Sequence, residues 1–375
     1  DVSDTVITLF QEVVGLGLDN SIRCGIGIHH ENDRMETWSV NSDLKGDVDL
    51  KMGMLNMGVH PMLVEVTKAR EKGVKRFYHE LTGEDVTRYY RALNNEPEYP
   101  LKVDLKTLPD KQYNNVFFFR DGVLFAFTQN PLSEEANRVL ERFASVFGQT
   151  YRRYLDLQKA EAQAREAQIE AALERIRARA MAMHSTDELT DVLGVLFDQF
   201  DFLGINPVLT HLTLFDEENE TFTLRIATSG TNRTIAEQQI DVNAVEAWKN
   251  SFANWKKSEL HALDCIDYPP EVLPYLWDVL HEVMNALPED QRIYASDYPE
   301  GLYTTQGHCN YGYIGFNHSR RATEEEKELV VRFAKEFGRL YQRFLDIQKA
   351  EAQAREAQIE AALERVRAKT MAMHN

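Results

Sequence analysis

The segment HEVMN at residues 281–285 comes closest to a catalytic motif in this chain. A zinc protease needs a second histidine four residues after the first, on the same helix face, and Asn285 stands there instead. A histidine that accepts phosphate would be followed by a nucleotide-binding domain, but Leu287-Pro288 and a hairpin follow here. The segment therefore predicts the polar face of a surface helix.

Other catalytic and metal-binding patterns are missing from the sequence. It has no GxSxG, phosphate-loop or GxGxxG motif, and no nucleophile is paired with a base in a known pattern. Cys24, Cys265 and Cys309 are far apart and form no CxxC pair, which indicates reduced thiols rather than disulfides or zinc ligands. We expect no catalytic residue, no metal and no cofactor, so this chain is not predicted to be an enzyme.

Aromatic side chains are concentrated between residues 248 and 313. They could serve core packing alone, or some of them could line a pocket for a planar ligand. The candidate ligand-binding residues are Trp248, Tyr303, His308 and Tyr313. Strand alternation separates Tyr311 and Tyr313 from Gly312 and Ile314, and the sequence leaves open which pair faces the pocket. The first half of the chain has a more apolar group of side chains around Met57 and Phe125, which suggests an occluded pocket.

The charge balance excludes two classes of partner. Asp and Glu outnumber Lys and Arg by 60 to 42, which gives a net charge of −18. Nucleic-acid surfaces and anionic membranes both require clustered positive charge. No apolar run approaches the length of a membrane span. We therefore expect a cytoplasmic protein that contacts neither nucleic acid nor membrane.

An internal repeat organises the chain. Residues 153–185 and 343–375 are identical at 27 of 33 positions, at an offset of 190. Gly122 and Gly312 share this offset. The predicted order is a domain at 1–130, a helix at 131–185, a second domain at 186–320 and a second helix at 321–375. Both chain ends fall within predicted helices, which suggests a piece of a longer protein.

Each domain has the same predicted order of elements, and the fold class is α+β. A leading helix (6–14 and 189–200) precedes the sheet. Later in each domain, a helix that crosses the sheet (84–93 and 271–286) precedes a final hairpin. Asp121-Gly122 is expected to give that hairpin a positive φ. The strands that open the two sheets are predicted at residues 22–30, 34–40, 208–215 and 221–228. Strands apolar on both sides imply an antiparallel sheet covered by helices on both faces.

The two long helices carry an apolar seam. Its positions are spaced four and three residues apart, as in a heptad repeat. The predicted seam residues are Ile169, Leu173, Ile176 and Met183 in the first copy, and Ile359, Leu363, Val366 and Met373 in the second. The seam favours a parallel two-stranded coiled coil between two chains, a homodimer. The alternative is a solvated single helix stabilised by charge pairs.

The helix sequence KAEAQAREAQIEAALERVRA-MAM, after a YGYIGF strand and an RFAxxFxxxYxRFLDxQ helix, resembles the GAF-containing sensors of bacteria, in particular sensor histidine kinases. The resemblance covers both domains. It implies a central antiparallel sheet with a small-molecule pocket on one face, parallel homodimers, and an output domain beyond residue 375. The family's cyclic-nucleotide and bilin signatures do not occur: His308-Cys309 reverses the order that bilin attachment uses.

The leading hypothesis for function is signal input and relay, in which a domain binds an unidentified small molecule and passes a shift to the helices. The alternative is a structural spacer that dimerises a parent protein and binds nothing.

Overall fold

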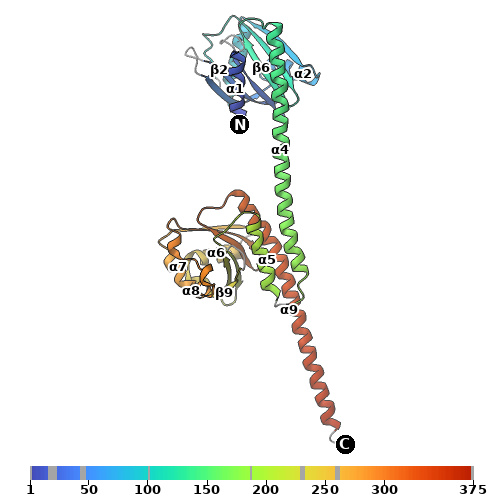
Figure 1. The fold of residues 1–375 in the computed structure, drawn as a ribbon, viewed down its shortest axis with the longest axis vertical. Coiled ribbons are helices and arrows are strands. Elements are labelled where there is room, and N and C mark those ends of the chain that lie inside the picture. The colour runs from blue at the N-terminus through green and yellow to red at the C-terminus, as the bar shows by residue number, and fades with distance from the viewer. Residues whose placement is uncertain are drawn as a thin grey trace. The chain divides into compact units, whose positions relative to one another are not determined.

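The computed structural model describes residues 2–15, 23–42, 48–99, 102–185, 188–228, 233–257 and 262–372 (Figure 1). The chain forms two compact units, unit 1 at Asp1–Ala162 and unit 2 at Gln163–Asn375. Both are α+β, each with a six-stranded antiparallel sheet. The sequence-based division treated residues 131–185 as a separate linker, whereas residues 163–185 belong to unit 2.

Unit 1 has the strand order β3-β2-β1-β6-β5-β4. Helices α1 and α4 pack on one face of this sheet, and α2 and α3 pack on the other. The strands are β1 (Arg23–His29), β2 (Arg34–Ser42), β3 (Val48–Asn56), β4 (Arg76–Thr82), β5 (Lys111–Phe119) and β6 (Gly122–Thr128). The helices are α1 (Val2–Gly15), α2 (Pro61–Glu71), α3 (Glu84–Asn95) and α4 (Glu134–Met181).

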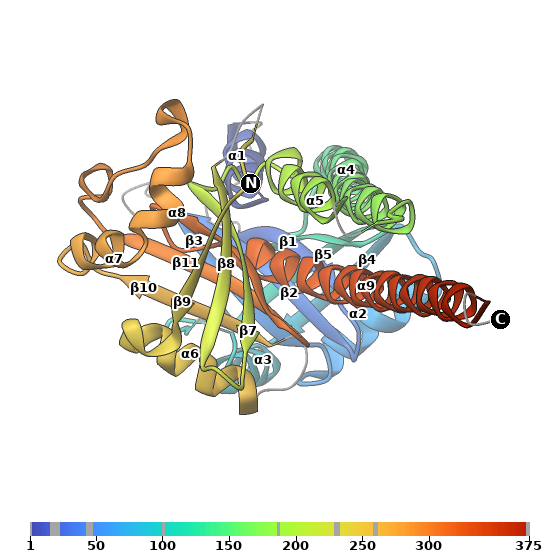
Figure 2. The ribbon, with the colours of Figure 1, turned by 90° about the horizontal axis from the view of Figure 1, so that it is seen from below.

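Unit 2 repeats this topology with the order β10-β11-β12-β7-β8-β9. Helices α5 and α9 pack on one face, and α6, α7 and α8 lie on the other (Figure 2). The strands are β7 (Leu209–Asp216), β8 (Thr221–Thr228), β9 (Ala236–Asp241), β10 (Leu263–Tyr268), β11 (Leu302–Cys309) and β12 (Gly312–His318). The helices are α5 (Leu189–Phe202), α6 (Glu246–Lys257), α7 (Leu273–Val279), α8 (His281–Ala286) and α9 (Glu324–Ala372), with short 3-10 turns at Val242–Ala244, Glu289–Gln291 and Ala295–Asp297.

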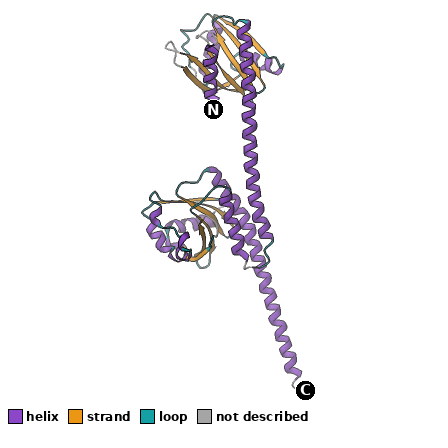
Figure 3. Cartoon of the chain, in the orientation of Figure 1, coloured by secondary structure: helices purple, strands orange, loops and turns teal. Residues whose placement is uncertain are grey.

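Most elements agree with the sequence prediction, including both long helices and the doubly covered sheets (Figure 3). The helix predicted at 271–286 is instead broken into α7 and α8 at Leu280, whose ψ of 11° is not helical. The predicted positive φ at Asp121-Gly122 is wrong, because neither residue has one. Gly122 is required by close approach, since a Cβ there would lie 2.0 Å from the carbonyl oxygen of Gly27.

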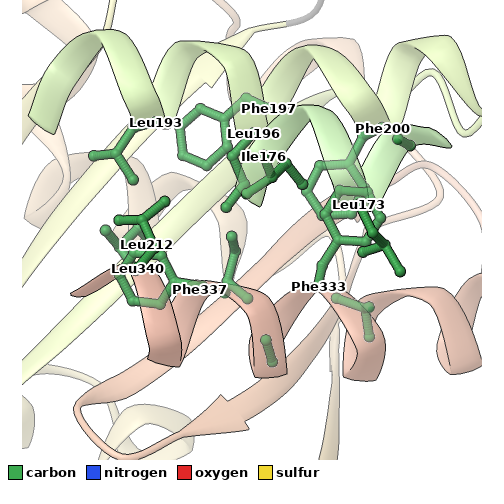
Figure 4. Close-up of a cluster of buried hydrophobic side chains, with 14 of the residues drawn as sticks. Leu173, Ile176, Leu193, Leu196, Phe197, Phe200, Leu212, Phe333, Phe337 and Leu340 are labelled. Atoms are coloured by element: carbon green, nitrogen blue, oxygen red, sulfur yellow. The ribbon is translucent and has the colours of Figure 1, made fainter. Parts of the chain in front are cut away.

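The first copy of the helix seam is a core element of unit 2, which corrects the coiled-coil prediction for it. Its residues are at most 5% exposed: Ile169, Leu173, Ile176 and Met183. They pack between α5 and α9 rather than on another chain (Figure 4). The apolar seam was correctly identified as needing a partner, and helices of the same chain provide it. The contacting residues include Leu196, Phe197, Phe200, Phe333, Phe337 and Leu340.

Polar contacts fix the register of α4 against α9. The Arg332 guanidinium lies 2.8 Å from Glu166 and 2.6 Å from Glu170. Here the cation is on α9. In a second pair the cation is on α4, where Arg177 lies 2.8 Å from the buried Glu336 of α9. Arg343 donates to the carbonyl oxygens of Ala180, Met181 and Met183, which satisfies acceptors that the end of a helix leaves open.

The second copy of the seam lies on the C-terminal part of α9 and is exposed. Ile359 is 44%, Leu363 51% and Val366 63% exposed. Met373 lies outside the described residues. Within residues 2–372, two near-identical helix segments therefore occupy opposite environments.

Candidate functional site

Unit 2 has a partly open cavity of about 80 Å³ between its sheet and helices α6, α7 and α8. This is the sheet face opposite α9. The walls are mainly apolar and aromatic, as in most small-molecule sites. The lining residues include Leu209, Phe215, Phe222, Trp248, Tyr268, Leu276, Trp277, Met284, Leu302 and Tyr313. The polar residues that line it are His211, Thr213, Ser251, Thr304, Gln306 and Asn317.

A chain of hydrogen bonds runs across the polar part of the cavity. Gln306 donates through Nε2 to a carboxylate oxygen of Asp264, 2.9 Å away. Its Oε1 therefore faces the His211 Nε2 at 3.1 Å and, as an acceptor, makes that nitrogen the donor. Ser251 donates its hydroxyl to the same Asp264 oxygen at 2.5 Å. The network locks the side-chain orientations at the sheet surface.

The His211 side chain, on the floor of the cavity, is uncharged at neutral pH. Burial lowers the pKa of His211 to about 4, against the opposing effect of its hydrogen bonds with Gln306 and Asn317. The imidazole, the glutamine and the asparagine that line the cavity carry no net charge, and the Asp264 carboxylate, which accepts from Gln306 and Ser251, is outside the lining. This chemistry suits an uncharged ligand with donor and acceptor groups.

The tryptophans at the site use their polar atoms within the protein. Trp248 donates its indole N–H to the Tyr268 hydroxyl at 2.9 Å, and Trp277 donates to the Ile293 carbonyl at 2.9 Å. Each leaves an apolar ring for the cavity wall. The arrangement favours contact with a flat, apolar ligand surface.

The structure brings two of the four predicted ligand residues to the cavity, Trp248 and Tyr313. Tyr313 is 1% exposed and donates its hydroxyl to the Ser251 carbonyl. His308 does not line the cavity, but its ring lies 4.6 Å from that of Tyr313 on the same side of the sheet. The open question of parity is settled by Tyr313, which lines the cavity while Ile314 packs on the α9 side. Tyr311 precedes β12 in the hairpin turn, does not follow the alternation, and packs on Tyr341 of α9 with 4.9 Å between the ring centroids.

The fourth predicted residue, Tyr303, does not face the cavity, so its prediction as a ligand-binding residue is wrong. Its neighbours Leu302 and Thr304 line the cavity, so alternation along β11 turns Tyr303 the other way. Gly307 shares its parity, and a Cβ there would meet Ala334 of α9 at 2.8 Å. Tyr303 is therefore on the α9 side, where Arg321 lies 5.9 Å from its ring centroid.

The sequence-based reasoning missed the polar floor. A signal existed in β11, where Thr304, Gln306 and His308 recur at every second position. Polar side chains at period two within a covered sheet indicate an internal polar face. Their partner His211 is 95 positions from Gln306, and no local pattern connects the two.

The described residues contain no group of three His, Cys, Asp or Glu side chains arranged to hold a metal ion. They also contain no helix long and apolar enough to cross a membrane. In the polar chain, three hydrogen bonds, by way of Gln306 and Asp264, separate the His211 imidazole from the Ser251 hydroxyl. The geometry therefore provides a binding surface with oriented hydrogen-bonding groups. No protein-family model matches the sequence, and comparison with curated proteins finds no match.

Proposed function

We propose that this chain is a sensory region of a signalling protein, in which unit 2 binds a small, uncharged, planar molecule. The observation that carries the proposal is the aromatic cavity whose lining polar groups are uncharged and are oriented by hydrogen bonds, two of them to the Asp264 carboxylate outside the lining. A doubly covered antiparallel sheet in both units supports the resemblance to GAF domains. The proposal makes the chain a regulatory input rather than an enzyme, located in the cytoplasm and acting on an output domain.

Strand β11 links the cavity to α9. Gln306 contributes to the cavity floor, and the adjacent Gly307 faces α9 so closely that a Cβ would lie 2.8 Å from the Val330 carbonyl oxygen. A ligand that displaces β11 would therefore press on α9. Packed helices have discrete arrangements, and a ligand biases them by its differential affinity.

We also propose that two chains form a parallel homodimer, and the exposed seam on α9 supports this. Ile359, Leu363 and Val366 repeat at spacings of four and three and have no apolar cover among the described residues. The near-identical first copy packs against apolar helices, so this sequence is suited to helix–helix contact. Two chains joined here would place their α9 helices in register and couple their units.

The structural spacer remains the second candidate, because the cavity is small and its polar groups bond to one another. Thermal shift of the whole chain against uncharged nitrogen heterocycles separates the two functions. If unit 2 is a sensor, at least one heterocycle should raise the melting temperature of the wild-type chain. This increase should disappear in Gln306→Leu and persist in Tyr303→Phe, a matched variant on the opposite face of β11. A hit unaffected by Gln306→Leu, or no hit together with no small molecule released on denaturation, contradicts the sensory function.

A further inference from the structure

Unit 1 has its own cavity, of about 30 Å³, between the sheet and helices α2 and α3. Most side chains in its wall are apolar, and three of the wall residues are methionines. The principal wall residues are Met35, Met57, Met62, Tyr89, Phe125 and Phe127. Methionine side chains are flexible and polarizable, so this wall can adapt to an occupant.

One cation, Arg23, lines this cavity. Its Nε donates to the Ser39 hydroxyl at 2.8 Å, and Nη2 donates to the Tyr99 hydroxyl at 2.7 Å. The guanidinium carbon lies 5.6 Å from the centre of the Phe127 ring. The third nitrogen, Nη1, is buried and makes no hydrogen bond of ordinary geometry, and the Tyr90 hydroxyl is the further neutral group that interacts with this guanidinium. Within the described residues, no carboxylate forms an ion pair with Arg23.

A guanidinium stays protonated in proteins, and a buried charge without a counter-ion is costly. Neutral hydroxyls satisfy two of the Arg23 nitrogens, yet no carboxylate in the described ranges offsets the charge. An anion beside Nη1 would provide both the missing hydrogen bond and the missing charge. Such charge-assisted bonds are stronger than neutral ones.

The repeat shows that this charge is specific to unit 1. In β1, Ile28 is the partner of Gly122, and in β7, Leu214 is the partner of Gly312, the glycine at the same repeat position. Arg23 and Leu209 each stand five residues before these anchors and are therefore equivalent. Leu209 lines the cavity of unit 2. The same fold accommodates leucine at this position, so the arginine is not needed for the strand.

We propose that unit 1 binds a small monocarboxylate, with its carboxyl group on Arg23 and a short apolar body among the methionine and aromatic side chains. The acid group would accept from Nη1 and lie near the hydroxyls of Tyr89 and Tyr99. The two units then take different ligands: a carboxylate in unit 1 and an uncharged molecule in unit 2.

Calorimetric titration of the whole chain at constant ionic strength tests this site. The probes are butyrate and benzoate, each compared with its neutral amide, butyramide or benzamide. At least one carboxylate should give saturable heat and its amide should not. Arg23→Leu should raise the Kd for that carboxylate at least ten-fold, because a hydrogen bond to a charged group is lost. Gln306→Leu in unit 2 should leave it unchanged.

Three outcomes overturn the proposal. The first is no saturable heat from either carboxylate. The second is binding that does not depend on the charge pair, seen as equal affinity for acid and amide or as affinity that survives Arg23→Leu. The third concerns stability: Arg23→Leu should not lower the melting temperature, since Leu209 occupies the equivalent position in unit 2. A large fall would mean that the charge is neutralised within the protein. Arg23→Lys, which retains the charge, should keep part of the affinity.

Discussion

Leu173 and Leu363 occupy the same position of the repeated helix sequence, yet Leu173 is 2% exposed and Leu363 is 51% exposed. Leu173 lies in the core of unit 2, where α5 and α9 cover it. Leu363 lies on α9 with no such cover among the described residues. Identical chemistry at the two sites makes them a controlled pair for experiment.

Leu173→Ala should destabilise unit 2 by about 3 kcal/mol, because it removes buried methyl groups and leaves a cavity. Leu363→Ala should change stability by less than about 0.5 kcal/mol, since exposed sites rarely contribute more. Denaturant unfolding monitored by tryptophan fluorescence suits this comparison. Three of the four tryptophans, Trp248, Trp255 and Trp277, are in unit 2. Equal losses from the two variants would contradict the packing described for α4.

Leu363→Asp should convert a dimer into monomers without unfolding unit 2. The substitution places a charge in the exposed seam, where two helices would otherwise bury leucine against leucine. Sedimentation velocity at micromolar concentration gives the association state, and circular dichroism checks the fold. Glu360→Asp, on the same stretch of α9 but outside the seam, serves as the control. A wild-type monomer, or a dimer that tolerates Leu363→Asp, would remove the seam from the mechanism.

Unit 2 should lose stability on acidification between about pH 6.5 and pH 4. His211 has a pKa of about 4 when folded, below the value of about 6.5 for an unfolded histidine. The unfolded state therefore binds the proton first, so the free energy of unfolding falls as pH falls through this window. The full difference corresponds to about 3 kcal/mol. Unfolding curves at several pH values measure it, and His211→Gln should flatten the dependence; an unchanged slope would assign the effect elsewhere.

A fragment of residues 163–375 should fold, whereas a fragment of residues 186–375 should not. The longer fragment keeps the part of α4 that covers Phe197, Phe200 and Phe333. The shorter one exposes these side chains and leaves Glu336 without Arg177. Cooperative unfolding and dispersed NMR spectra report the outcome. Two equally well-folded fragments would show that residues 163–185 only join the units.

Local patterns were sufficient for most elements of the fold. The strand predicted at residues 221–228 is β8, and the helix predicted at 189–200 is α5, longer by two residues. The seam shows the limit of this reasoning. An apolar stripe on a helix requires a partner, but the stripe is compatible with any apolar helix face. Its spacing could not distinguish α5 and α9 of the same chain from a second chain.

The candidate site was predictable only in part, for a related reason. Aromatic enrichment pointed to Trp248 and Tyr313, which line the cavity. Alternation along a strand places Tyr303 and Thr304 on opposite faces, but it does not tell which of them faces the cavity. The floor depends on the pairing of β7, β12 and β11, which brings His211 to Gln306. That pairing is a property of the tertiary structure.

The repeat in the sequence and the unit in the fold are out of phase. In the sequence, each copy of the helix follows its sheet domain, whereas in the fold the first copy completes the core of the domain that comes after it. Duplication of a domain together with its following helix would therefore supply every added domain with a ready-made docking surface. Chains built on this plan can lengthen by whole modules without the evolution of a new interface at each junction.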